Sequence, residues 1–311
     1  MRKYSHLFFT SSISTLLIVC GVVGYGFTAS SAYAQTSQNS SQLAEIKDQI
    51  HQLFELQDSI TIPQQEKDIQ ELKLRRTILT LIVAETQKQT NTAYDEFKNV
   101  QLPNSDDWKQ IDTSIRTSFE AAQKYYTDVE NRISNDPNIT SSLLKNIARD
   151  MEEKKTQEID PLIKKSHAIV ATFNITDMLK VGEDRLAKIT LDVDKIYAQK
   201  LTRSNTLKQL LEKAATALTQ ARELNNSSKE TILYAYAPSE TGSSTEFIDT
   251  LYKKLTQNRA TSTPQSTSSP DPIADVIQSY IQKTITDSIS NIKSVYDTFI
   301  KMSSNVKSYL K

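Results

Sequence analysis

The stretch IADVIQSYIQKTITDSISNIKSVYDTFIKMSSNVKSYLK, residues 273–311, places a large apolar residue at every third or fourth position. This spacing matches one face of an α-helix. The ten steps from Ile273 to Leu310 cover 37 residues, so the mean step is 3.7, which favours straight or slightly right-handed packing over a left-handed dimer seam. The sequence therefore predicts one amphipathic interaction helix. Its stripe consists of Ile273, Ile277, Ile281, Ile285, Ile289, Ile292, Tyr296, Phe299, Met302, Val306 and Leu310.

The apolar face of this helix is wider than a two-helix seam requires. We expect more than one partner helix to cover it, supplied by the rest of the chain, by other copies or by another protein. Its five Lys and three Asp give too weak a basic face to favour a membrane surface. The segment before it, 261–272, has seven Ser/Thr and three Pro, which is typical of a solvated linker. We expect this linker to hold the helix off the body as a docking element.

Residues 42–260 repeat the helical spacing, and we interpret them as the body. Ile60 and Ile69 fall on the apolar stripes of its first two helices, and ILTLIVA at 78–84 is apolar all round, which indicates burial. Long helices with short connections favour antiparallel neighbours. The predicted fold is all-α: an elongated antiparallel helical bundle, or coiled-coil-like body, with a separate C-terminal amphipathic helix.

Several polar or proline-containing segments mark the expected helix ends. A break or kink is predicted at Pro161, where a chain continuing as helix would lose a backbone donor. The longest helix is expected between the turns 173–177 and 225–228. A short helix is expected over 229–237, and another over 246–259, after the loop 238–245. The other expected interruptions are Pro63, 102–107, 134–140, 173–177 and 225–228.

The N-terminal 34 residues have the three parts of a secretory signal. Arg2 and Lys3 precede an apolar run, and small residues follow, with Ala32 and Ala34 at the −3 and −1 positions of a cleavage site before Gln35. The alternative is an uncleaved anchor over 7–27. Both alternatives predict an extracytoplasmic protein, secreted or associated with the cell envelope, in which 35–41 is a polar spacer.

Composition argues against several classes of function. Only two of the five glycines lie beyond residue 34, so a hairpin-rich β protein or a glycine-rich nucleotide loop is disfavoured. Cys20 is the only cysteine and lies within the signal, which leaves no disulfide or thiolate beyond it. Without Arg2 and Lys3 there are 35 basic and 37 acidic residues, a balance that argues against nucleic acid.

No catalytic or metal-binding pattern is present. His51 and His167 are isolated, and no P-loop, G-x-S-x-G or EF-hand loop occurs. We expect no cofactor, no metal and no enzymatic activity. Tyr234 and Tyr236, beside the loop 238–245, are a possible binding surface because tyrosine combines an apolar ring with a polar end.

These observations favour a non-enzymatic exported scaffold, spacer or protein-interaction module that binds a protein partner or itself through helices. Contact with a membrane is expected only through the N-terminal segment, if that segment is retained. One alternative is a secreted helical protein that inserts into membranes, as pore-forming proteins do. A second is a protein that binds or hydrolyses a polymer of the cell envelope.

Overall fold

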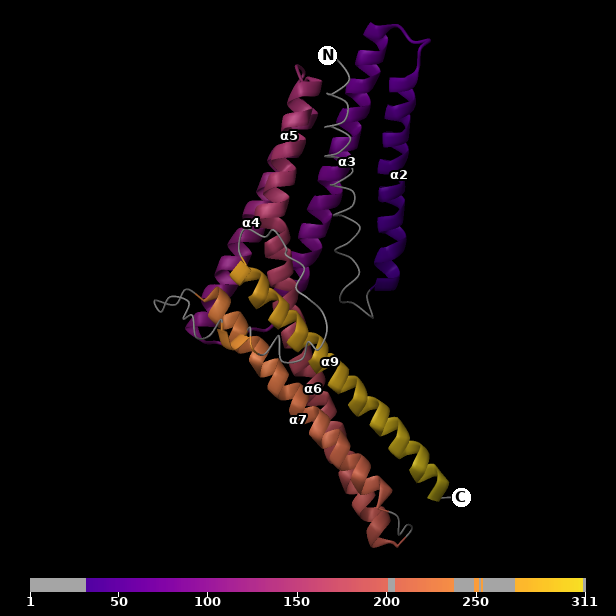
Figure 1. Ribbon diagram of the computed structural model, residues 1–311, viewed down its shortest axis with the longest axis vertical. Coiled ribbons are helices and arrows are strands. Elements are labelled where there is room, and N and C mark those ends of the chain that lie inside the picture. Colours follow the sequence, from indigo (N-terminus) through magenta and orange to yellow (C-terminus); the bar gives the residue numbers. More distant parts are fainter. Residues whose placement is uncertain (1–31, 201–204, 238–248, 252, 254–271, 310–311) are drawn as a thin grey trace. The chain divides into compact units, whose positions relative to one another are not determined.

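The computed structural model describes residues 32–200, 205–237, 249–251, 253 and 272–309. Regular structure in these ranges is helical, without a strand, which confirms the all-α class. A π-helical turn, η2 (Lys155–Ile159), joins two of the helices. Figure 1 shows the α-helices with their labels. The α-helices are α2 (Ala32–Asp58), α3 (Gln64–Lys98), α4 (Asp106–Asn135), α5 (Ser141–Lys154), α6 (Asp160–Ala198), α7 (Thr206–Tyr236) and α9 (Pro272–Tyr309).

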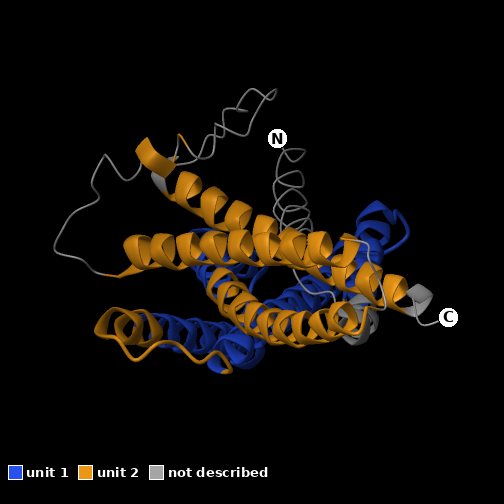
Figure 2. Ribbon diagram, turned by 90° about the horizontal axis from the view of Figure 1, so that it is seen from below, with its two compact units in different colours: residues 1–98, 114–166 blue, residues 99–113, 167–311 orange. Residues whose placement is uncertain are grey.

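The chain divides into two compact units (Figure 2). Unit 1 comprises residues 1–98 and 114–166, and unit 2 comprises 99–113 and 167–311. This division places the C-terminal helix in the same unit as the second half of the expected body. Residues 1–31 lie outside the described part, so the signal peptide or anchor stays a prediction. Helix α2 begins at Ala32 and therefore includes the segment 35–41 that we expected to precede the first helix.

The core of unit 1 is built from apolar stripes on α3 and α4. On α4, buried side chains recur at steps of three and four residues, as the helical period requires. The apolar stretch of α3 is buried as expected, and the Tyr94 ring stacks on Phe119 with centroids 5.1 Å apart. The buried set on these two helices includes Ile78, Leu79, Ile82, Val83, Ile115, Phe119, Ala122, Tyr126, Val129 and Ile133.

The π-helical turn lies where the sequence predicted a break or kink. Pro161 has no N–H and its ring crowds the preceding turn, so regular α-helical bonding cannot continue through it. The chain widens instead, and the Asp160 amide bonds the Lys155 carbonyl five residues earlier. This wider turn brings the two side chains together: Lys155 Nζ lies 2.6 and 2.8 Å from the Asp160 carboxylate oxygens, and the pair is largely buried.

Two predicted turns are wrong. Helix α6 continues through 173–177 and α7 through 225–228, so both polar segments are helical. Their side chains hydrogen-bond within and between helices: Thr176 Oγ1 donates to the Thr172 carbonyl at 3.2 Å, and Asn225 Nδ2 donates to Thr176 Oγ1 at 2.9 Å. Polar residues that would favour a turn in isolation are thus accommodated by helix packing.

The long helix expected between these turns is interrupted. Helix α6 ends at Ala198 and α7 begins at Thr206, and Lys200 between them has a left-handed φ of 55°. No glycine or proline marks this reversal in the sequence. Beyond it, α7 packs back along α6, where a Cβ on Gly182 would lie 2.9 Å from Leu218 Cδ2. The absence of a side chain at Gly182 therefore permits this close approach.

Helix α9 packs along α7, so the expectation that the linker holds it off the body is wrong. The two helices are antiparallel: Tyr236 bonds Gln278, whereas Ser228, nearer the start of α7, bonds Thr284, nearer the end of α9. Small buried residues of α7 allow close approach, and Ser288 Oγ donates to a backbone carbonyl of α7 at 3.2 Å. These small residues are Ala214, Ala217 and Ala221.

The apolar stripe of α9 is largely buried by this packing. The side chains of Ile289, Tyr296 and Val306 are half-buried, and those of Ile273 and Leu310 lie outside the described set. The linker 261–271 and most of the helix expected after residue 245 also lie outside it. The buried stripe positions are Ile277, Ile281, Ile285, Ile292, Phe299 and Met302.

Candidate functional site

Exposed apolar side chains are concentrated where α2 turns into α3. We call residues 54–73 the hairpin tip. Ile60 in the connection is 97% exposed, Ile69 on the first turns of α3 is 64% exposed, and Phe54 on α2 is also exposed. Leaving such side chains in water forgoes about 25 cal/mol for each Å² that burial would remove. A group of them within a short segment marks a candidate interaction surface.

The hairpin tip is held by hydrogen bonds between its two helices. Lys67 Nζ donates to the carbonyls of Gln57 and Ser59, at the C-terminal end of α2. The Lys67 ammonium group thus donates hydrogen bonds to carbonyls at the helix end, which have no N–H partner within the helix. Gln57 Nε2 also donates to Glu71 Oε1 at 3.1 Å, and Glu71 pairs with Arg75. The exposed isoleucines therefore lie on or beside a turn whose two helices are joined by hydrogen bonds.

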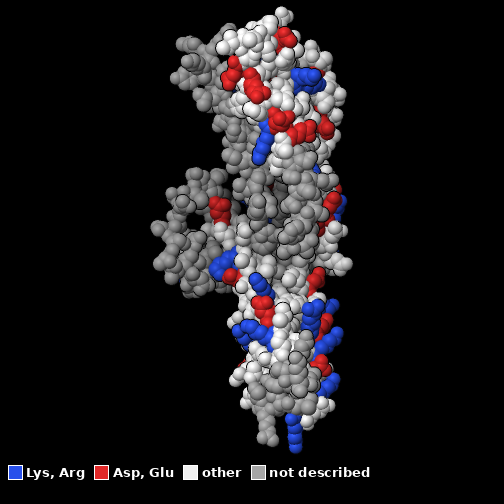
Figure 3. Space-filling view, turned by 90° about the vertical axis from the view of Figure 1, so that its right-hand side faces the viewer, with Lys and Arg blue, Asp and Glu red and all other residues white. Residues whose placement is uncertain are grey.

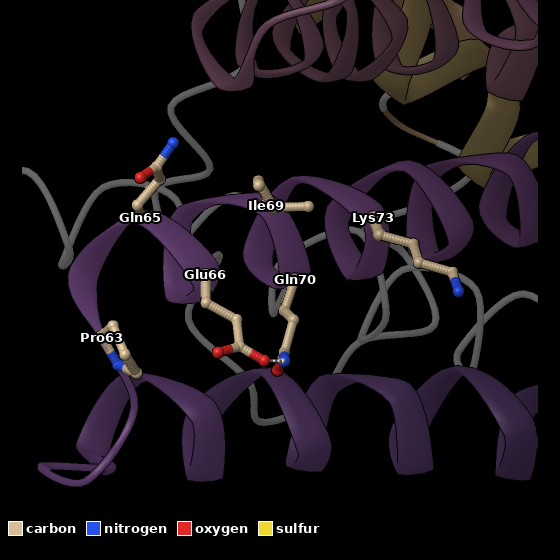
Figure 4. A pocket seen from close by; sticks show the side chains of 6 residues that line it. All are labelled: Pro63, Gln65, Glu66, Ile69, Gln70 and Lys73. Atoms are coloured by element: carbon tan, nitrogen blue, oxygen red, sulfur yellow. Dashed lines mark hydrogen bonds between the residues drawn. The ribbon is translucent and has the colours of Figure 1, made fainter.

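An open hollow runs along the α3 side of the hairpin tip (Figure 4). Ile69 and Pro63 provide its apolar part, and a hydrogen bond of 3.2 Å joins the Gln70 amide to Glu66 at its edge. All of its lining residues come from α3 or from the residue just before it, so the hollow is a surface depression. The lining residues are Pro63, Gln65, Glu66, Ile69, Gln70 and Lys73.

Acidic side chains surround these apolar residues. The hairpin tip has five acidic and two basic residues, and acidic side chains gather around this end of unit 1 in Figure 3. Asp68 accepts from the neutral Gln64 amide at 2.6 Å, and Glu66 likewise has a neutral amide partner. One of the two cations, Lys67, is bound to backbone carbonyls. Glu71 is paired with Arg75, whereas the charges of Glu66 and Asp68 face solvent.

The two tyrosines proposed from the sequence lie at the end of α7. The Tyr236 hydroxyl donates to Gln278 Oε1 of α9 at 3.2 Å, and burial raises the pKa of Tyr236 to about 12. Tyr234 is half-buried on the same helix. Tyr236 thus helps to join α7 to α9, and the role of the pair as a binding surface stays a prediction.

Unit 1 also contains a buried polar group that the sequence did not reveal. Burial raises the pKa of Tyr126 far above its usual value, and the negative charge of Asp160 adds to the effect. The phenol therefore remains protonated at neutral pH and cannot act as a base. The hydroxyls of Thr86 and Thr90 face its oxygen and partly offset the rise in its pKa. This arrangement supports packing rather than chemistry.

The sequence did not reveal the hairpin tip either. Ile60 and Ile69 were assigned to apolar stripes, which predicts burial, yet both are exposed. The available signal was the segment SITIP, 59–63, which places isoleucines beside a proline where the chain must leave the helix. On the predicted interaction helix, the side chain of Ile300 lies at the edge of the apolar stripe and is 65% exposed.

The described ranges contain neither a metal-binding cluster nor a membrane-spanning helix. No group of three or more His, Cys, Asp or Glu side chains there could hold a metal ion. Within those same residues, no helix has the length and apolar character needed to cross a membrane. Compared with known proteins, the chain matches no family model, no curated protein and no solved structure.

Proposed function

We propose that this protein is a non-enzymatic, exported helical scaffold or spacer that binds a protein partner through the hairpin tip. The observation that carries the proposal is the exposure of Ile60 and Ile69 on a turn held by Lys67. Apolar side chains on a rigid scaffold, ringed by polar groups, have the composition of a protein-binding surface. Export is part of the proposal and rests on the first 34 residues.

The packing of the apolar stretch at 78–84 supports this function over membrane insertion. Ile78, Ile82 and Val83 belong to the core of unit 1, where they are at most 3% exposed. Their release into a bilayer would require unit 1 to open and lose that core. The hairpin tip, in contrast, can make a contact without any rearrangement of the fold.

Site-specific photo-crosslinking tests the proposal. A photoreactive residue replaces Ile60 in one variant and Leu191, an equally apolar exposed position of α6, in the control. Both proteins are applied to the surface of the cells that produce the protein. Crosslinks to a protein from position 60, absent from position 191 and removed by excess unlabelled protein, would support the proposal. Equal crosslinking from both positions, or none from position 60, would contradict it.

A further inference from the structure

The hairpin tip requires a partner of defined charge. Its exposed isoleucines are flanked by exposed carboxylates, among them Asp58 and Glu66. A second hairpin tip is excluded as the partner because like charges would face each other across the contact. The matching surface must offer apolar contact together with basic side chains.

One end of unit 2 has this character. Helix α9 runs antiparallel to α7, so its last turns lie beside the start of α7 (Figure 1). We call residues 198–200, 205–213 and 298–306 the basic end. They contain four lysines and one glutamate, and Ile300 is exposed among them. The lysines are Lys200, Lys208, Lys213 and Lys301, all exposed.

We propose that the hairpin tip of one copy docks on the basic end of a second copy. This proposal rests on the proposed function and makes it more specific, because it names a second copy of this chain as the protein partner. Ile60 and Ile69 bury against the surface around Ile300, and the carboxylates of the hairpin tip face the lysines of the basic end. The contact joins two different surfaces, so a pair of copies still has one free hairpin tip and one free basic end, and further copies can add to it.

The chemistry of the contact predicts its dependence on salt and sequence. Charges at the edge of an interface mainly accelerate association and are screened within about 8 Å at physiological ionic strength. Self-association should therefore weaken severalfold between 50 mM and 500 mM salt. Ile60→Ser should weaken it about tenfold, as expected for a central apolar side chain. Leu191→Ser, at an exposed apolar position of α6, should leave it unchanged.

A reciprocal charge exchange tests the pairing, with the whole protein purified from the cells that produce it. Variant A combines Asp58→Lys and Glu66→Lys, and variant B combines Lys208→Glu and Lys301→Glu. All four positions are exposed, and melting temperatures verify that both variants fold. Sedimentation velocity should show the wild type associating, A and B each monomeric when alone, and their mixture associating again.

Each other outcome rejects a defined part of the proposal. A wild type that stays monomeric up to millimolar concentration rejects the second copy as partner, and crosslinking from position 60 to another protein would then leave the proposed function standing. Variants A and B that associate as well as the wild type reject both surfaces. If A and B are monomeric and their mixture remains so, the two surfaces do not pair with each other.

Discussion

The α7–α9 pair and the α2–α3 hairpin are both long antiparallel helix pairs, but they use their apolar residues differently. Along α7 and α9 most apolar residues of the facing stripes are buried and polar ones bond across the interface, as Ser228 does with Thr284 at 2.6 Å. At the hairpin tip, Ile60 in the connection and Ile69 on α3 face solvent, although the sequence places both on apolar stripes. An apolar stripe therefore indicates a face that requires a partner, and the fold decides whether the chain itself supplies one.

Deletion of α9 should have the largest effect, and it should disrupt the α7–α9 pair while leaving the α2–α3 hairpin folded. Deletion of 272–311 exposes the face of α7 that contains Ala214 and Ala221, so unit 2 loses the part of its core that α7 and α9 share. We expect α7 to lose its protection from hydrogen exchange while α3 in unit 1 keeps its own. Exchange mass spectrometry of the two helices measures this. Unchanged protection of α7 would mean that α9 is not needed to bury it.

The next largest difference should be in the stability of two variants, one with a substitution at a buried isoleucine of α9 and one at an exposed isoleucine of the hairpin tip. Ile281 on α9 is fully buried, so Ile281→Ala should reduce the free energy of unfolding by about 2–5 kcal/mol. Ile60→Ala should change it by no more than about 0.5 kcal/mol, because Ile60 is already exposed. Urea denaturation of both variants gives the comparison. Similar losses would show that Ile60 is buried in solution.

High pH should destabilise the α7–α9 pair through Tyr236. Its pKa is 10.0 ordinarily and about 12 when folded, so the unfolded chain loses this proton first. The stabilisation is complete below pH 10 and is lost as the pH rises to about 12, by about 2 kcal/mol. Thermal melts at pH 9 and pH 11.5 should show a smaller pH-dependent loss for Tyr236→Phe than for the wild type. Equal losses would assign the effect to other groups, such as Tyr126.

The sequence predicted the fold class well because helical spacing and scarce glycine are local properties. It placed the helix ends less well. The segments 173–177 and 225–228 contain residues that favour turns, and only the contact between Asn225 and Thr176 shows why they remain helical. The reversal near Lys200 has no local signal. The hairpin tip was missed for a similar reason: exposure of Ile60 and Ile69 depends on whether another helix covers them, which spacing does not encode.

The coupling between Ser228 and Thr284 should be small, and a double-mutant cycle isolates it. Thr284 Oγ1 also lies 3.0 Å from the Tyr280 carbonyl, so it keeps an acceptor within its own helix when Ser228 is removed. Ser228→Ala should therefore cost only about 1 kcal/mol. Thr284→Val should cost a similar amount, and the double variant should cost less than the sum, with a coupling of about 0.5–1 kcal/mol. Thr286→Val, at an exposed position on the same helix, controls for the change in helix propensity. Strict additivity would mean that the two hydroxyls do not interact, and that other contacts between α7 and α9, such as that of Tyr236 with Gln278, set the register of the pair.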